Sequence, residues 1–547
     1  RTTPESLEEV LPLANEDRSL VLVMDGRVDN FDDLRHELLG HGAVLRTRSD
    51  AELVLRAFER WGEACVHHIV GECVFFIWDL RRRMLFGARD GPGARHFYYH
   101  QGSGWFAFAS EIKGLLALPI ERRLNETRLL DYLVGAFDRD DEVGTFYQGI
   151  LRLPAGHAMA YSAQGLCTWR WWNPAELVEQ KYVSLAECSE AFMDQLRVVV
   201  RCRLRSIRPV GAMLSGGLDS STIVGLISKE FRGELREPLC TFSLIREDRE
   251  ACADWRGIDQ ILQADPWLHP TIVTSAAVDQ MWQSHLDGIA LEDEPFSAFN
   301  GLTYGLTYAA ACEAGCGVVL DGMACDALFY DLGKTAGLVA RSPRISRIRE
   351  LIQSYRYHGA PVGPWRDMLA AMPGALMPKG LRTVLSPPVR WLRDARTLKS
   401  GDLARLRPEI ASAYLATRRA AADAKTPRWP GSDLQQHAGR FSSGLISFGH
   451  ETYGPLALAR GVEPRSPFSD RRLIEFAVRM PLAAKLALPR YKHLLRAGSA
   501  GILPAAVCGR ADIGGHPGWT FFQRLAGAVA RAYPEAWTAA AEAKGLD

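Results

Sequence analysis

The chain has 547 residues, of which 47% are hydrophobic and 24% are charged, and its formal net charge is +1. This length predicts two or more domains, because one ordinary core does not extend so far. The near-neutral charge gives no sign of a nucleic-acid partner or an anionic membrane surface. No apolar run approaches the ~20 residues of a membrane-spanning helix. Eleven cysteines without a CxxC pair are typical of reduced thiols and predict a cytoplasmic protein.

Residues 1–175 show short apolar strands and two amphipathic helices. Helical periodicity covers 31–40 and 50–61, and Ser49 with Glu52 offers an N-terminal cap for the second helix. Glycine-rich and proline-rich turns separate the strands. Apolar runs typical of strands occur at 20–24, 73–78, 84–88, 105–109 and 157–161. This pattern predicts an α+β domain.

From residue 184 to residue 547 the pattern changes to alternating strands and helices. Helices are expected at 184–205 and 220–229, and strands at 210–214, 239–244 and 317–320. Such alternation predicts an α/β domain with a parallel sheet flanked by helices. At about 333–442 the sequence predicts a helical insertion with about 20 Lys and Arg against about 7 Asp and Glu.

The segment Ser215-Gly216-Gly217-Leu218-Asp219-Ser220-Ser221 lies between a predicted strand and a predicted helix. Its glycines permit a tight turn and close backbone approach to a ligand, and the helix start presents N–H groups that suit an anion. We predict that the nucleotide is bound by Ser215, Gly216, Gly217, Asp219 and Ser220. A carboxylate beside phosphates makes sense if Asp219 holds Mg²⁺. The alternative is a plain turn, and the segment is not a Walker A loop.

This segment resembles the ATP-pyrophosphatase superfamily, and within it the asparagine-synthetase-like group. That group joins a glutaminase-like domain of the class II, Ntn type to an ATP-pyrophosphatase synthetase domain. The resemblance implies the same organisation here, with domains at 1–175 and 184–547. It covers most of the chain, and further matching segments are 25–30, 49–52, 88–90, 108–113, 201–205 and 467–473.

The resemblance implies ATP and Mg²⁺ as cofactors and assigns further residues. Asp219 and Asp326 match the group's magnesium-binding aspartates. Gly322 and Leu244 stand where relatives contact the nucleotide. Lys492 matches the lysine that stabilises the adenylate and the charge that develops when it is attacked. The alternatives are a helix N-cap for Asp326 and a solvated helix lysine for Lys492.

The first domain departs from relatives that free ammonia from glutamine. Those relatives use an N-terminal cysteine, whereas this sequence begins with Arg1 and has its first cysteine at Cys65. Asp25 stands where an asparagine would help to hold the oxyanion and glutamine. We expect a glutaminase-like domain that lacks the catalytic cysteine and serves for structure and docking. A natural start upstream of Arg1 stays open.

Two related types of enzyme with such a domain take the amine from their own substrate, namely β-lactam synthetases and the macrolactam synthetases that close lasso peptides. The proton-accepting tyrosine of the β-lactam enzymes falls on Met323, which cannot titrate. Their glutamate has a counterpart in Glu451, which we predict to be the base, with a surface helix residue as the alternative. An α-amine has a pKa of ~8, so one carboxylate suffices. His450 is an alternative base.

The long interval between Asp326 and Glu451 favours a substrate larger than a metabolite. Its basic insertion is either a solvated face or a clamp for a peptide. The acidic run Glu292-Asp293-Glu294 is predicted to line the acceptor pocket, and a solvated loop is the alternative for at least two of its members.

These features predict a ligase that resembles the lasso-peptide macrolactam synthetases. ATP would adenylate an Asp or Glu side chain of a precursor peptide, and the peptide's N-terminal amine would close an isopeptide ring and expel AMP. The resemblance also implies a leader-peptide protease as a partner. The alternatives are a β-lactam synthetase, a glutamine-hydrolysing asparagine synthetase and a non-catalytic nucleotide-binding scaffold. Asp219, Asp326 and Lys492 together argue against the scaffold, which needs none of them.

Overall fold

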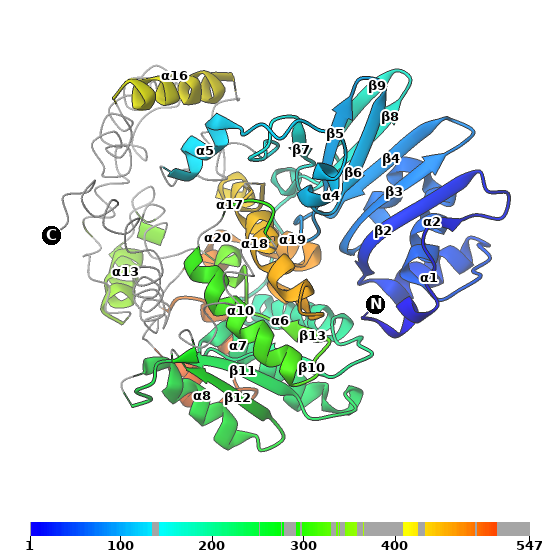
Figure 1. Cartoon of the computed structure of the whole chain (residues 1–547). Coiled ribbons are helices and arrows are strands. Elements are labelled where there is room, and N and C mark those ends of the chain that lie inside the picture. Colours follow the sequence, from blue (N-terminus) through cyan, green and yellow to red (C-terminus); the bar gives the residue numbers. More distant parts are fainter. Residues whose placement is uncertain are drawn as a thin grey trace.

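A computed structural model describes residues 2–133, 142–250, 252–274, 276–277, 292–295, 298–329, 335–336, 339, 345–357, 365, 408–424, 433–442, 444–486 and 490–510. In these residues no helix is both long and apolar enough to span a membrane. Two bodies follow one another along the chain, as the blue-to-cyan and green-to-orange parts of Figure 1 show.

The first body is built on two antiparallel sheets. The larger sheet has the order β1-β2-β3-β4-β8-β9 and the smaller one has the order β6-β5-β7. Its strands are β1 (Leu13–Ala14), β2 (Leu20–Val28), β3 (Gly71–Asp79), β4 (Met84–Arg89), β5 (Tyr98–Gly102), β6 (Trp105–Ala109), β7 (Ile150–Arg152), β8 (His157–Ser162) and β9 (Gly165–Arg170). Its helices are η1 (Pro4–Leu7), α1 (Phe31–Gly40), α2 (Asp50–Trp61), η2 (Gly62–Ala64), α3 (Cys65–His68), α4 (Ile112–Leu116) and α5 (Glu126–Leu133).

Alternation along β3 explains how the layers stack. Phe75 and Ile77 point into a core shared with α1 and α2, whereas Phe76 points toward the smaller sheet. Phe76 stacks on Phe97 and Phe108, with ring centroids 4.4 and 3.4 Å apart. One strand therefore supplies both apolar layers, as a period of two residues requires. The α+β prediction is confirmed.

The second body contains a five-stranded sheet in the order β12-β11-β10-β13-β14, in which every neighbouring pair is parallel. The strands are β10 (Val210–Met213), β11 (Cys240–Ile245), β12 (His269–Thr274), β13 (Val318–Leu320) and β14 (Glu463–Arg465). Val210 and Ala212 of β10 and all three residues of β13 are fully or almost fully buried, which is typical of a sheet covered on both faces. The prediction of a parallel α/β domain is confirmed.

Helices cover this sheet and connect it to the first body. They are η3 (Pro174–Glu176), α6 (Leu185–Cys202), α7 (Leu218–Glu230), η4 (Arg232–Glu234), α8 (Ala253–Ala264), α10 (Ala298–Glu313), α11 (Cys325–Leu328), α18 (Leu445–Leu458), η6 (Pro467–Ser469), α19 (Arg471–Arg479), α20 (Leu482–Lys485), α21 (His493–Gly498) and α22 (Ala505–Gly509). In Figure 1, α18 and α19 lie between the green sheet and the first body. The predicted insertion contains α13 (Ile345–Tyr357), α16 (Pro408–Ala424) and α17 (Asp433–Ser442), and its other parts lie largely outside the described residues.

Candidate active site

Two loops leave the same edge of the parallel sheet side by side. One follows β10 and leads into α7, and the other follows β13 and leads into α11. β10 and β13 are neighbours, with β11 and β12 on one side of the pair and β14 on the other. The crevice outside the carboxyl ends of the strands, at the point where strand order reverses, is where open α/β sheets bind ligands. The fold therefore places both predicted motifs at the expected binding edge.

Glycines allow these two loops to approach closely. Gly216 has a φ of +71°, and a Cβ there would lie 2.4 Å from the Asp254 carbonyl oxygen. A Cβ on Gly322 would lie 3.1 Å from the Ser220 nitrogen. The Ser220 hydroxyl accepts from the Ser215 N–H at 3.1 Å and lies 2.9 Å from the Ser215 hydroxyl. The turn is thus held in shape by its own serines while the start of α7 stays close to the second loop.

A single ammonium group joins the two aspartates predicted to bind metal. Lys492 Nζ lies 2.5 Å from Asp219 Oδ2 and 2.6 Å from Asp326 Oδ1. The Tyr491 hydroxyl donates to the same Asp326 oxygen at 2.8 Å. Lys492 is 7% exposed and occupies the N-cap position of α21, so the alternative of a solvated helix lysine is wrong. Asp326 lies in the first turn of α11, where Ala324 is the N-cap, so the N-cap alternative is wrong too.

The charges at this site determine the protonation state of the lysine. Burial alone would lower the pKa of Lys492, but Asp219 and its other anionic neighbours raise that pKa well above its ordinary value. Partial desolvation would raise the pKa of Asp326, whereas Lys492 lowers it below its ordinary value. The site therefore holds a permanent cation between two carboxylates at neutral pH.

The donor set fits a magnesium ion. Asp219 Oδ2 contacts the lysine, while Asp219 Oδ1 is buried and has no hydrogen-bond partner among the described residues. An unpartnered buried carboxylate oxygen is costly unless a cation or donor satisfies it. Carboxylate oxygens are the ligands that Mg²⁺ prefers. Asp219 and Asp326 would hold the ion, which would neutralise phosphate charge when bound.

Leu244 occupies the corresponding edge of the neighbouring strand. It is the next-to-last residue of β11 and pairs with Val273 of β12. Strand β11 adjoins β10, so Leu244 lies at the same sheet edge as the Ser215–Ser220 turn. The structure thus brings together the residues predicted to bind nucleotide and metal: Ser215, Gly216, Gly217, Asp219, Ser220, Leu244, Gly322 and Asp326.

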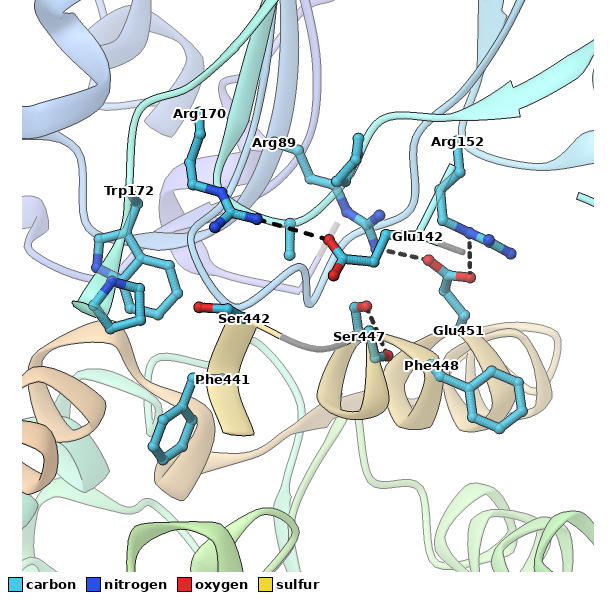
Figure 2. A pocket seen from close by; sticks show the side chains of 14 residues that line it. Arg89, Glu142, Arg152, Arg170, Trp172, Phe441, Ser442, Ser447, Phe448 and Glu451 are labelled. Carbon is cyan, nitrogen blue, oxygen red and sulfur yellow. Dashed lines mark hydrogen bonds and ion pairs between the residues drawn. The ribbon is translucent and has the colours of Figure 1, made fainter. Parts of the chain in front are cut away.

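Glu451 lies elsewhere, on the face of α18 that contacts the first body. Its carboxylate is 2.8 Å from Arg89 and 2.8 Å from Arg152, as Figure 2 shows. The side chain is 7% exposed, so the alternative of a surface residue is wrong. Burial would raise the pKa of Glu451, but Arg152 and Arg89 lower it to about 2. The role of Glu451 as base stays a prediction, and its partners make it a weak proton acceptor.

Other predicted neighbours surround the same helix. Met323 of the β13 loop lies against α18, since a Cβ on Gly449 would lie 3.2 Å from its sulfur. His450 is buried, and burial lowers its pKa to about 4. A neutral imidazole of this kind accepts protons poorly near pH 7. His450 is therefore a weaker alternative base.

The acidic run Glu292-Asp293-Glu294 lines a pocket with Glu451. This acidic pocket is also lined by His96, Tyr98, Pro295, Phe448, Thr452 and Pro455. Asp293 accepts from the Ile112 and Lys113 N–H groups at 2.6 and 3.0 Å, and Glu294 lies 2.5 Å from Arg152. These partners contradict the reading of Asp293 and Glu294 as members of a solvated loop.

Glu292 differs from its two neighbours. Its Oε1 is buried without a hydrogen-bond partner among the described residues, and burial raises its pKa to about 8. A carboxylate with this pKa exchanges protons readily with an amine. The sequence singled out Glu292 only as a pocket residue, because burial is not visible in a short acidic run.

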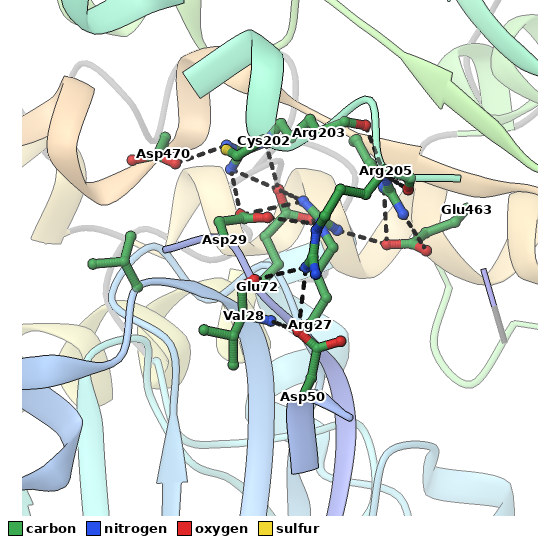
Figure 3. A network of polar contacts seen from close by, with 12 residues as sticks. Arg27, Val28, Asp29, Asp50, Glu72, Cys202, Arg203, Arg205, Glu463 and Asp470 are labelled. Atoms are coloured by element: carbon green, nitrogen blue, oxygen red, sulfur yellow. Dashed lines mark hydrogen bonds and ion pairs between the residues drawn. The ribbon is translucent and has the colours of Figure 1, made fainter. Parts of the chain in front are cut away.

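A buried polar network holds the first body to the second. From the first body it contains Arg27, Asp29 and Glu72, and from the second it contains Arg203, Glu463 and Asp470 (Figure 3). Arg203 is 1% exposed and lies 2.7 Å from Asp470, 3.0 Å from Glu72 and 3.2 Å from Asp29. Arg27 lies 2.5 Å from Glu463. Charges so deeply buried are stable only when paired, so the two bodies stabilise one another here.

Comparisons with known proteins follow the same division of the chain. Residues 7–172 match the family described as a glutamine amidotransferase domain, and residues 191–532 match the family described as asparagine synthase. The second match spans more than half of the chain. The glutaminase-like character of the first body and the synthetase character of the second are thereby shown.

Relatives with curated names are similar over different lengths. The glutamine-hydrolyzing asparagine synthetase 1 of Bacillus subtilis is 24% identical over 92% of this chain and 76% of its own length. A putative glutamine-hydrolyzing asparagine synthetase of Mycobacterium bovis is 27% identical over 90% of this chain and 74% of its own. The asparagine synthetase 3 of Bacillus subtilis is 35% identical over 42% of this chain, and the match spans 37% of that relative's length.

Proposed function

The chain belongs to the asparagine synthase family, and we propose that it joins the N-terminal amine of a peptide to a side-chain carboxylate of the same peptide. As a family member it is an ATP-dependent carbon–nitrogen ligase of the AMP-forming type. The finer proposal is the closure of a macrolactam ring in a lasso precursor peptide. Its expected partners are that peptide and a leader-peptide protease.

The observation that carries the ligase chemistry is the ammonium of Lys492 between Asp219 and Asp326, beside the glycine turn. A buried, permanently charged lysine stabilises negative charge that develops on a phosphate or on a tetrahedral carbon. The two aspartates would hold Mg²⁺. The carboxylate oxygen attacks the α-phosphorus of ATP, pyrophosphate leaves, and the amine then displaces AMP from the acyl group.

The acidic pocket supports an amine that comes from the substrate. A protonated peptide N-terminus is attracted by carboxylates, and Glu292 and Glu451 both line this pocket. The proton must leave the amine before the bond forms. Glu451 is the predicted acceptor, and Glu292 is the alternative because its pKa of about 8 matches that of an α-amine.

The interface supports a docking role for the first body. Arg89 and Arg152 pair with Glu451 and so connect α18 to the first body. Arg27 pairs with Glu463 and so connects β14 to the first body. A domain used in this way positions the helix that carries Glu451. Ammonia supplied by the first body is not part of the proposed reaction.

The test compares substrates in the same assay. Purified protein with ATP and Mg²⁺ is given a linear precursor-type peptide, free aspartate with glutamine, or a carboxyethyl amino acid, and pyrophosphate and product masses are measured. We expect pyrophosphate and a product one water lighter with the peptide only. Asparagine formation from aspartate would overturn the finer proposal and favour the second candidate, an asparagine synthetase, which the names of the relatives support.

A further inference from the structure

Glu451 also lines a second pocket, which adjoins the acidic pocket. It is lined by Arg89, Arg152, Arg170, Glu142 and Glu451, and its apolar wall contains Pro154, Ala155, Trp172, Pro174, Phe441 and Phe448. We call this site the arginine pocket; Figure 2 shows it from close by. It shares Phe448 and Glu451 with the acidic pocket, so the two pockets adjoin along α18.

The three arginines of this pocket differ in how they are satisfied. Arg89 and Arg152 are almost fully buried and lie within 2.8 Å of carboxylates. Arg170 is 36% exposed, and its nearest carboxylate among the described residues is Glu142 at 3.9 Å, which exceeds hydrogen-bond distance. Figure 2 shows its guanidinium directed into the pocket. Arg170 is therefore the cation that a ligand can engage.

The surroundings of Arg170 indicate the chemistry of that ligand. One weakly engaged guanidinium suits a single carboxylate, which it can bind with two parallel N–H donors. A polyphosphate would need more unpaired positive charge than one arginine supplies. The prolines and aromatic rings beside it favour an apolar side chain next to the carboxylate.

We propose that the arginine pocket binds a carboxylate with an adjacent apolar side chain from the peptide substrate, and that Arg170 is its cationic anchor. This inference rests on the proposed function. The acidic pocket attracts the peptide's ammonium group while the arginine pocket holds a carboxylate farther along the same chain. Because the acidic pocket is negatively charged and Arg170 is positively charged, the two pockets together fix the direction in which the peptide lies along α18.

The test measures binding without ATP. Gly-Phe-Glu-Phe-Gly amide and its Gln twin, both labelled with an uncharged BODIPY dye, present an internal carboxylate or its neutral analogue. Labelled Gly-Gly-Phe-Phe with a free C-terminus and its amide twin present a terminal carboxylate or its neutral analogue. Fluorescence anisotropy gives Kd for the full chain. We expect one acidic probe to bind ~10-fold more tightly than its neutral twin, as for a hydrogen bond to a charged group, and the pair that discriminates identifies the source of the carboxylate.

Variants test whether Arg170 causes the preference for the acidic probe. Arg170→Gln should remove the preference, and Glu142→Gln should strengthen it because the competing carboxylate is gone. Arg197→Gln is a matched control, since that side chain is 34% exposed and lies on α6. The inference is overturned if each acidic probe has the same Kd as its neutral twin. It is also overturned if Arg170→Gln still binds an acidic probe more tightly than its neutral twin.

The same variants separate this inference from the proposed function. If Arg170 binds the carboxylate but no peptide is cyclised, the pocket assignment stands and the macrolactam proposal fails. If peptides are cyclised with the same KM in Arg170→Gln as in the parent chain, the macrolactam proposal stands and the pocket assignment fails.

Discussion

Replacing Glu451 with glutamine removes the carboxylate that Arg89 and Arg152 share where the two bodies meet. The three side chains are at most 7% exposed, so solvent screens this interaction little. Burial opposes the charge, yet the arginines lower the pKa of Glu451 from 4.5 to about 2. At about 1.4 kcal/mol for each pKa unit, the ionised carboxylate contributes about 3 kcal/mol to stability.

The sign of the pH dependence follows from the lowered pKa. Because Glu451 binds its proton less tightly in the folded state, its contribution is complete above pH 4.5 and is lost as the pH falls toward 2. We expect Glu451→Gln to lower the free energy of unfolding by about 3 kcal/mol at pH 7. The difference from the parent chain should shrink as the pH is lowered below 4.5.

The assay is urea unfolding followed by near-ultraviolet circular dichroism, with Glu230→Gln as the control. Glu230 pairs with Arg197 at 2.7 Å but is 30% exposed, so its loss should cost less than about 1 kcal/mol. Equal losses in Glu451→Gln and Glu230→Gln would refute the reasoning. If Glu451 is also the base, the folded variant keeps ATP–pyrophosphate exchange and loses ring closure; full ring closure would refute that role.

Three further predictions concern the reaction centre. Asp219→Ala should abolish pyrophosphate release with an unchanged circular dichroism spectrum, and undiminished turnover would contradict the magnesium assignment. Lys492→Gln should lower kcat ~10²- to 10³-fold with a smaller change in KM for ATP; a change confined to KM would contradict its role in the transition state. If Glu292 accepts the proton, ring closure should accelerate as pH rises through about 8, because only the ionised carboxylate is a base. Persistence of this rise in Glu292→Gln would show that another group titrates.

Local sequence patterns predicted the elements that position the site. The periodicity at 31–40 and 50–61 matches α1 and α2, and the Ser49 side chain accepts from the Glu52 N–H as the capping pattern requires. The glycine turn lies between β10 and α7 as expected. Such features depend on residues close together in the chain, so their physical signal is visible in the sequence.

Ion pairs between residues far apart in the chain have no comparable signal in the sequence. Glu451 pairs with Arg89 and Arg152, which lie about 300 or more residues away in the sequence. Its local sequence does not distinguish it from a residue on the surface of a helix. The local sequence of Glu463 likewise does not show that it contacts Arg27 and Arg95 in the buried network. Burial raises the pKa of Glu292, and residues from distant segments line the pocket in which it lies. Which carboxylates lie buried and how they are paired could therefore be learned only from the fold.

The most direct test of the account follows an oxygen atom. A linear peptide whose acceptor carboxylate carries ¹⁸O at both oxygens is incubated with the protein, ATP and Mg²⁺, and the nucleotide product is analysed by mass spectrometry. Activation at the sheet edge where Asp219 and Asp326 lie predicts one ¹⁸O in AMP, together with unlabelled pyrophosphate. Formation of ADP with labelled phosphate, or AMP without ¹⁸O, would contradict activation of the carboxylate through an acyl-adenylate.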